Sequence, residues 1–400
     1  MEVITIKLFN KVTPEGTKDK LFDECEKRSA IGSSLRNLFC SRGFKEVSTP
    51  VLEYYDVFKT SCGYFPQESM YKLVDQSGRL LVLRPDCTIP IARLTGSRLK
   101  NEKRPLRIFY DQNVYRYPTG NSGVSGEISQ MGVEYIGSNL PICDVEIVEL
   151  ACNSLGSSCG GDYQLELCHI GYFKALIESL GTDENTSEQI RELVEHKNFP
   201  ALDSILENFK SCKASVALKK LPALFGSISV IDEARSLFSS EKSDAALDYL
   251  AYIYRSLSEL GIEKHLTIDL GLVNQADYYT GIIFRGYTAG AGEPVLAGGR
   301  YDLLIEDFGA GRPATGFGIN LDLLCEKISS KSGDKKSLTA AVLADSNSSV
   351  EKAFGEVNSL IKNGYIAEIV AVDSAFDDFQ YQSFDKVISI VGDIVKEVKA

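Results

Sequence analysis

The sequence has little of what a membrane or secreted protein requires. No uninterrupted apolar run approaches the length needed to span a bilayer. The first residues, MEVITIKLFNKVTPEG, lack the basic stretch followed by an apolar one that marks a secretory signal. The 400 residues are 44% hydrophobic and 24% charged, ordinary values for a globular chain with a full core and room for more than one domain. We therefore expect a cytoplasmic protein without a membrane-spanning segment.

Histidine is scarce, and cysteine is poorly spaced for chemistry. The three histidines, His169, His196 and His265, have no sequence neighbours suited to a metal site or to acid–base catalysis. The ten cysteines include no C-x-x-C pair, which argues against a zinc site and, in a chain of this length, against a disulfide framework. Scattered buried thiols are the favoured interpretation, and the sequence predicts neither a metal nor a cofactor.

Positive charge is also limited. The net charge is −12, and the sequence pI is about 5.0. The richest short basic stretch is KNEKRPLR at residues 100–107, and no dense cluster of lysine and arginine occurs. A nucleic-acid-binding protein usually presents a basic face, so a tRNA-binding role is disfavoured, although a local basic patch can occur on an acidic protein.

The chain shows three regions and no tandem repeat. Residues 18–42 have helical periodicity ended by Gly43, and residues 44–58 look extended, with Pro50 indicating an edge, a bulge or a subunit seam. Two hairpins are predicted, one at residues 70–84 and one joining LRIFYDQNVYRY to ISQMGVEYIG.

Helical periodicity then dominates residues 171–260, which favours a helical insertion at about 171–262. Residues 329–337 are a polar linker, and residues 338–400 form a small module with a strand, a helix and two strands.

Four motifs contain most of the residues suited to ligand recognition. They are LRPDCTIPIAR, VYRY followed by SQMGVEYIG, ADYYTG, and AGGRYD. Each has a plain structural explanation when taken alone: Asp86 as a helix N-cap, Glu134 as a solvated strand end, Tyr278 and Tyr279 as core aromatics. All four in this order, over about residues 13–324, resemble the histidyl-tRNA synthetases.

The resemblance implies an α+β fold with a class II aminoacyl-tRNA synthetase core. That core is an antiparallel sheet flanked by helices, here over residues 1–328, with the helical insertion and the small C-terminal α/β module as additions. The first helix and the strand carrying Pro50 would form a two-fold dimer interface, as in this class.

The residue types fit a ligand that carries an ammonium, a carboxylate and an imidazole. An ammonium needs acceptors, an imidazole N–H needs a carboxylate or phenol oxygen, and a carboxylate or phosphate suits an arginine fork. Asp86 replaces the family's usual glutamate, which shortens that acceptor by one methylene. By the resemblance, the histidine-like ligand pocket comprises Asp86, Thr88, Arg116, Gln130, Glu134, Asp277, Tyr278, Tyr279, Arg300 and Tyr301.

The phosphate side of the resembling site has lost its charge. Adenylation develops negative charge on ATP, which arginines or metal ions must stabilise. Asn274 stands where the synthetases have an arginine before Asp-Tyr-Tyr, and Leu323 stands where an arginine closes their third signature motif. The loop PTGNSGVSGE after Arg116 contains no lysine or arginine. The pattern therefore predicts recognition without catalysis.

A second family has the same combination. DYYTGIIFRGY, GEPVLAGGRYD and RPDCTIPIAR are similar to the regulatory subunits of ATP phosphoribosyltransferase. This resemblance implies a non-catalytic protein required for the first step of histidine biosynthesis and for its feedback regulation by histidine. It would form a homodimer within a hetero-oligomer with the short catalytic subunit, with histidine as a candidate ligand and without tRNA.

Two alternatives remain open. One is a divergent but active histidyl-tRNA synthetase, with Arg285 or Arg312 supplying the missing cation. The other is a relative that acts on a different small molecule on the same fold. The histidine could also bind at a contact with the partner rather than in the inherited pocket.

Overall fold

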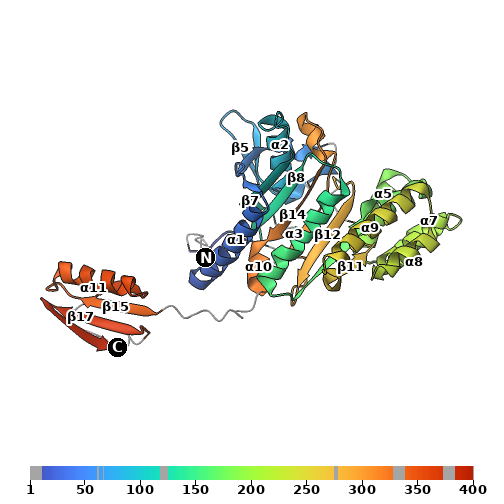
Figure 1. The fold of residues 1–400 in the computed structure, drawn as a ribbon. Coiled ribbons are helices and arrows are strands. Elements are labelled where there is room, and N and C mark those ends of the chain that lie inside the picture. Colours follow the sequence, from blue (N-terminus) through green and yellow to red (C-terminus); the bar gives the residue numbers. More distant parts are fainter. Residues whose placement is uncertain are drawn as a thin grey trace, which may run out of the picture. The chain divides into compact units, whose positions relative to one another are not determined.

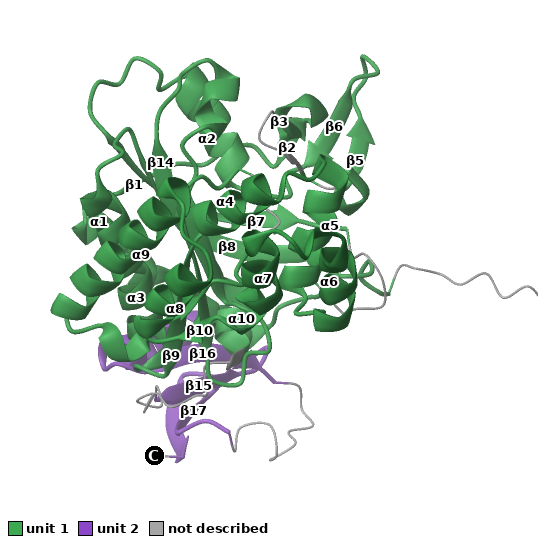
Figure 2. Cartoon of the chain, turned by 90° about the vertical axis from the view of Figure 1, so that its right-hand side faces the viewer, with its two compact units in different colours: residues 1–329 green, residues 330–400 purple. Residues whose placement is uncertain are grey.

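The structure is a computed structural model. It describes residues 11–60, 63–65, 67–117, 125–273, 278–327, 338–372 and 383–399. The chain divides into two compact units, residues 1–329 and residues 330–400, which are coloured separately in Figure 2. Each unit is described by itself. The predicted linker at residues 329–337 lies outside the described residues.

A large mixed sheet forms the centre of the first unit (Figure 1). Within the described residues it has nine strands in the order β1-β7-β8-β14-β13-β12-β9-β11-β10. Neighbours are antiparallel except for the pairs β1·β7 and β11·β9, which are parallel. The strands are β1 Lys45–Glu46, β7 Leu106–Tyr115, β8 Glu127–Ile136, β9 Tyr163–His169, β10 Phe225–Gly226, β11 Leu266–Asp269, β12 Ile282–Thr288, β13 Leu296–Arg300 and β14 Ala314–Asn320.

One face of this sheet is apolar and packs on helices. Side chains alternate between the faces of a strand, so Phe109, Phe317 and Phe284 share one face through their register with Val133, Gly298 and Leu167. Helices α1 (Phe22–Ser41) and α3 (Pro141–Cys159) cover this face, as Figure 1 shows. Phe39 of α1 contacts the rings of Phe109 and Phe317 at centroid distances of 5.9 and 6.1 Å.

The opposite face is rich in glycine and polar residues, and we call it the glycine face. One registered row across it contains Glu134, Gly316 and Gly299. The next row runs from Tyr110 through Gly132, Gly318 and Ala297 to Arg285. Small residues on several adjacent strands leave room above the sheet that larger side chains can occupy. The predicted ligand residues on β8 belong to this face.

A smaller sheet is formed by strands that lie between β1 and β7 in the sequence. Its order is β2-β6-β5, from β2 Leu52–Tyr54, β5 Lys72–Val74 and β6 Leu80–Leu83. The expected continuous extended segment at residues 44–58 is interrupted: Pro50 separates β1 from β2, and a 3-10 helix, η1 Tyr55–Phe58, follows. Proline has no N–H for a strand ladder, which accounts for the break. The remaining short elements are β3 Lys59–Thr60, β4 Gly63–Tyr64 and η2 Gln67–Ser69.

The segment between β9 and β11 is mostly helical, and Figure 1 shows its helices beside β11. Side chains of Leu202, Leu218, Leu247 and Leu250 are buried within it and belong to the same apolar core as the large sheet. The short strand β10 joins it to the large sheet through β11. Its helices are α4 Ile170–Leu180, α5 Glu184–Glu195, α6 Phe199–Leu206, α7 Lys213–Lys220, α8 Ser229–Leu237 and α9 Glu241–Glu259, with 3-10 turns η3 Glu207–Phe209, η4 Leu221–Ala223 and η5 Glu263–His265.

Three further elements complete the first unit: α2 Thr88–Ser97, η6 Leu304–Phe308 and α10 Leu321–Lys327. They follow β6, β13 and β14 respectively. Along the described parts of the chain, no helix combines the length and apolar composition that crossing a membrane requires.

The second unit is a four-stranded sheet with one helix. Its strands lie in the order β16-β15-β17-β18, and α11 packs on one face through Ala353, Val357 and Leu360. The expected strand–helix–strand–strand pattern is present, and β18 adds a further edge strand. The elements are β15 Thr339–Ala344, α11 Val350–Lys362, β16 Ile366–Ala371, β17 Lys386–Val391 and β18 Ile394–Lys399.

Candidate functional site

The glycine face supports a buried carboxylate. A Cβ atom added to Gly316 would overlap the Glu134 carboxylate, and one added to Gly132 would lie 2.5 Å from Tyr110 Oη. Only glycine at these positions lets the side chains of Glu134 and Tyr110 lie directly on the sheet. The small residues of β8 and β14 therefore determine where the acid and the phenol sit.

Glu134 is held by neutral hydroxyl groups. Its side chain is buried, with 1% of the residue exposed. Thr88 Oγ1 donates to Oε1 at 3.0 Å, and Tyr301 Oη donates to Oε2 at 2.5 Å. Burial raises the pKa of Glu134 to about 8, against the two hydrogen bonds, which lower it. Among the described residues the carboxyl group thus has donors but no cation within ion-pair distance. A ligand that brings a positive charge or an N–H would favour its ionised form.

Asp86 lies beside this group, at the start of a helix. Its Oδ1 accepts a hydrogen bond from the backbone N–H of Ile89 at 2.9 Å, in the first turn of α2. Burial raises the pKa of Asp86, and the N–H of Ile89 and the charge of Arg116 oppose that rise. The N-cap residue of α2 is Cys87, so Asp86 lies one residue before the cap position. Its bond to Ile89 uses Oδ1, and a ligand could still bind the second carboxyl oxygen.

Arg116 is positioned by neutral partners. Its Nε donates to the carbonyl of Pro85 at 3.0 Å, and its guanidinium lies 5.3 Å from the ring centre of Phe65. Among the described residues no carboxylate forms an ion pair with it within 4.0 Å. A cation in this state suits an incoming carboxylate or phosphate.

Tyrosines surround the two carboxyl groups. The rings of Tyr278 and Tyr279 lie 4.7 Å apart, and those of Tyr278 and Tyr301 lie 5.9 Å apart. Lys174 of α4 donates to the backbone carbonyl of Tyr279 at 3.0 Å. Burial raises the pKa of all three phenols, so they remain neutral donors. We call this group the carboxylate–tyrosine cluster; its members are Asp86, Tyr110, Glu134, Tyr278, Tyr279 and Tyr301.

Two of the remaining predicted residues, Thr88 and Gln130, also lie at the cluster. Thr88 binds Glu134 directly, and the Gln130 amide lies against Gly318, with its Oε1 buried and lacking a partner among the described residues. Asp277 lies outside the described residues, as does Asn274.

Arg300 is not brought to the cluster. Its Nε pairs with Asp144 Oδ2 of α3 at 2.8 Å, and its Nη1 pairs with Asp302 at 2.9 Å. Neighbouring residues of a strand point to opposite faces, so Arg300 faces α3 while Gly299 faces the cluster. Tyr249 Oη also donates to Asp144. The arginine of AGGRYD therefore anchors a helix to the apolar face.

Tyr110 was not expected from the motifs. Tyr110 is on β7, where it is 1% exposed and pairs with Gly132 of β8. Burial raises the pKa of its phenol well above the ordinary value. Its position depends on the pairing of β7 with β8. The sequence indicates the position of Tyr110 only through the alternation along LRIFYDQNVY, which places Ile108, Tyr110 and Gln112 on one face of the strand.

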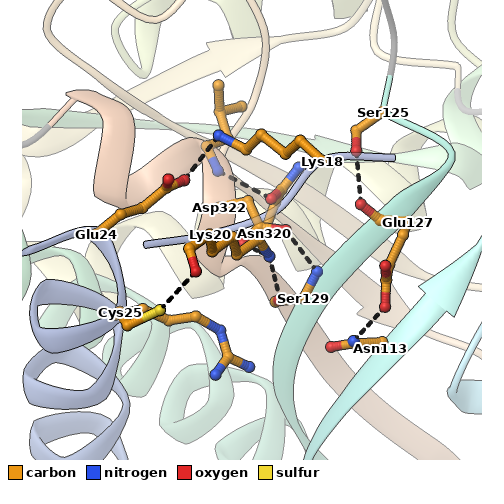
Figure 3. Close-up of polar contacts among 12 residues, drawn as sticks. Lys18, Lys20, Glu24, Cys25, Asn113, Ser125, Glu127, Ser129, Asn320 and Asp322 are labelled. Atoms are coloured by element: carbon orange, nitrogen blue, oxygen red, sulfur yellow. Dashed lines mark hydrogen bonds and ion pairs between the residues drawn. The ribbon is translucent and has the colours of Figure 1, made fainter. Parts of the chain in front are cut away.

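The predicted phosphate side lies where β14 ends and α10 begins, and Figure 3 shows the polar contacts around Asp322 there. Leu323 is 9% exposed, and its backbone N–H donates to Asn320 Oδ1 at 3.0 Å. The adjacent Asp322 accepts from Lys20 Nζ at 2.5 Å and from the backbone N–H of Ser129 at 2.8 Å. An apolar side chain and an internally neutralised acid thus occupy this end of β14 and α10.

The two arginines considered as replacements have other partners. Arg285 Nη2 pairs with Glu195 at 2.8 Å. Arg312 Nη2 donates to the carbonyls of Lys100, at 3.2 Å, and Glu102. Within the ranges that the structure describes, no group of three or more histidine, cysteine, aspartate or glutamate residues could hold a metal ion.

The chain is similar to known proteins over most of its length. The histidyl-tRNA synthetase family matches residues 16–324. The ATP phosphoribosyltransferase regulatory subunit of Clostridium kluyveri is 40% identical over 378 residues, covering 93% of this chain and 96% of that protein. The regulatory subunit of Acetivibrio thermocellus is 40% identical over 314 residues, covering 78% and 75%.

The chain belongs to the family of ATP phosphoribosyltransferase regulatory subunits. A solved structure of an ATP phosphoribosyltransferase regulatory subunit/histidyl-tRNA synthetase from Bacillus halodurans C superposes with a TM-score of 0.83 at 31% identity, covering 96% of this chain and 99% of that chain. The histidyl-tRNA synthetase of Nostoc sp. PCC 7120 shares the fold, with a TM-score of 0.73 at 18% identity. The predicted family and the predicted class II fold are confirmed.

Proposed function

We propose that this chain acts as the non-catalytic regulatory subunit of an ATP phosphoribosyltransferase and that its carboxylate–tyrosine cluster binds histidine as a feedback signal. The observation that carries the proposal is the contrast within one site. Among the described residues Glu134 keeps two neutral donors and no cation within ion-pair distance, whereas Leu323 and the neutralised Asp322 occupy the phosphate side. Recognition groups line the cluster, whereas the ammonium of Lys20 on the predicted phosphate side is already paired with Asp322.

Histidine matches the groups of the cluster. Its imidazole N–H suits Glu134, whose ionised form a positively charged or N–H-bearing ligand favours. Its ammonium suits the carboxyl group of Asp86 and the Oε1 of Gln130, which has no hydrogen-bond partner among the described residues. Its carboxylate suits the guanidinium of Arg116.

Loss of catalysis follows from the energetics of charge stabilisation. Removing one donor to a developing anion costs about 2.7–4 kcal/mol in the transition state. The side chain of Leu323 supplies neither a charge nor a hydrogen bond, and that of Asn274 supplies no charge. Both replaced arginines would contact the phosphates of ATP, so we do not expect useful adenylation of an amino acid.

The partner is the short catalytic subunit of the phosphoribosyltransferase, which would bind the nucleotide substrates. We place this chain in the cytoplasm, as a homodimer within a hetero-oligomer, with no tRNA partner. The supporting observation is family membership along most of the chain.

The test is co-purification of the full chain with the short catalytic subunit, followed by a phosphoribosyl-transfer assay with and without histidine. We expect a stable complex, transfer activity that depends on this chain, and inhibition by histidine. Histidine-dependent exchange of pyrophosphate into ATP by the purified chain alone would overturn the proposal in favour of an active synthetase.

A further inference from the structure

The end of α5 in the helical insertion carries a bridging carboxylate. Glu195 Oε1 accepts from Arg285 Nη2 of β12 at 2.8 Å, and Glu195 Oε2 accepts from Arg191 Nη1 at 2.9 Å. The side chains are largely buried, with 17% of Glu195, 21% of Arg285 and 8% of Arg191 exposed. A partly buried carboxylate shared by two guanidinium groups is a stronger link than an exposed surface pair.

Local helix preferences do not account for Glu195. It is the last residue of α5, where the helix dipole disfavours a negative charge. Lys197, two residues later, has a left-handed backbone with φ of 52°, which is uncommon for a residue with a side chain. Its Nζ approaches Asp269 of β11 at 3.4 Å. Tertiary contacts with the sheet therefore hold this helix end in place.

The same helix end contacts the chain leading to the cluster. Arg191 Nη1 also donates to the backbone carbonyl of Val273 at 3.2 Å. Val273 precedes the segment that carries Tyr278 and Tyr279 of the cluster. Arg191 therefore joins Glu195 to the base of that segment.

Arg285 connects this bridge to the glycine face. It lies in the row that runs through Ala297 and Gly318 to Gly132, on the same face as Glu134. The ring of Tyr279 lies against Gly299, which pairs with Ile283, and Arg285 is two residues from Ile283 on the same face of β12. The bridge thus borders the cluster on the side of the helical insertion.

We propose that Glu195 is a positioning residue for ligand recognition. It holds Arg285 beside the cluster and, through Arg191, it contacts the backbone of Val273. The helical insertion is then part of the ligand site, although it supplies no group to the ligand. Because coupling between two parts of a protein is reciprocal, a bound ligand would also stabilise the docked position of α5. This inference rests on the proposed function.

The test measures histidine affinity by titration calorimetry on the full chain, with the melting temperature recorded for every variant. Glu195→Gln should raise the Kd for histidine by about tenfold, within the range of typical coupling energies. The matched control is Glu178→Gln, in the same subdomain, because Glu178 pairs with Lys242 at 2.6 Å with both side chains exposed. The control should leave the Kd unchanged.

Further variants separate a positioning role from an effect on general stability. Arg285→Lys keeps the charge and should retain most of the affinity, whereas Arg285→Met should lose as much as Glu195→Gln. Combining Arg285→Met with Glu195→Gln should add little, because both changes remove the same link. Glu195→Asp, which is too short to bridge both arginines, serves if Glu195→Gln does not fold, and should weaken binding severalfold.

The outcomes distinguish this inference from the proposed function. No histidine binding by the wild-type chain would overturn both. Normal wild-type binding with an unchanged Kd in Glu195→Gln, even with a lower melting temperature, would overturn only the positioning role.

Discussion

Two carboxylates in this protein show how one fold can keep recognition and lose chemistry. Glu134 and Asp322 each accept two hydrogen bonds. The partners of Glu134 are neutral hydroxyl groups, whereas Asp322 is paired with the ammonium of Lys20. The first acid remains open to a cationic or N–H-bearing ligand, and the second is already neutralised by its own chain. A carboxylate near a ligand site is informative only together with its partners.

The largest expected effect tests the boundary of the cluster. Arg300→Met removes the partner of Asp144, which is fully buried, and should lower the free energy of unfolding by about 3–5 kcal/mol because a buried charge is left unpaired. The Kd for histidine of the folded fraction should not change. Chemical denaturation and calorimetry measure the two quantities, and a Kd that rises without a loss of stability would return Arg300 to the ligand site.

The next effect compares the two carboxylates directly by the same chemical change. Glu134→Gln should weaken histidine binding by roughly 2–3 kcal/mol, on the order of a hundredfold in Kd, because an ionised acceptor is lost. Asp322→Asn is the matched control and should leave the Kd near its wild-type value. Equal losses in both variants would contradict the division of the site into two regions.

A smaller effect is expected on the neutralised side. Lys20→Met leaves Asp322 without its cation and should cost about 1–2 kcal/mol of stability. It should neither change histidine affinity nor give ATP–pyrophosphate exchange. Denaturation curves and an exchange assay measure these outcomes, and any exchange activity in this variant would show that the phosphate side is blocked rather than lost.

The free energy of unfolding should also change with pH, by a small amount for each pH unit. The pKa of Glu134 is about 8 in the folded chain and ordinarily 4.5, so the folded state holds this proton more tightly than the unfolded state. The resulting stabilisation is fully present below about pH 4.5 and is lost as pH rises towards 8, by at most about 1.4 kcal/mol per pH unit. The difference in unfolding free energy between wild type and Glu134→Gln should fall across this window. A flat difference would mean that Glu134 titrates normally.

Sequence motifs located the cluster but could not resolve its members. Arg300 and Tyr301 are adjacent in AGGRYD, yet Tyr301 binds Glu134 while Arg300 binds Asp144 on the other face. The face of a strand residue depends on register and on which helix covers which side, and neither is local information. The break in the expected strand at Pro50 has a local cause instead, because proline has no backbone N–H to donate to a neighbouring strand.

The sequence by itself determined the family, the class II fold, the helical insertion and the presence of Asp86, Thr88 and Glu134 in one site. Ordered motifs and periodicity encode these features locally. Only the tertiary structure decided that Lys20 neutralises Asp322 and that Glu195 bridges α5 to β12, because each contact joins segments far apart in the chain. The charge state of the site follows from these distant contacts, since electrostatics and desolvation depend on distance in space rather than on order in the sequence.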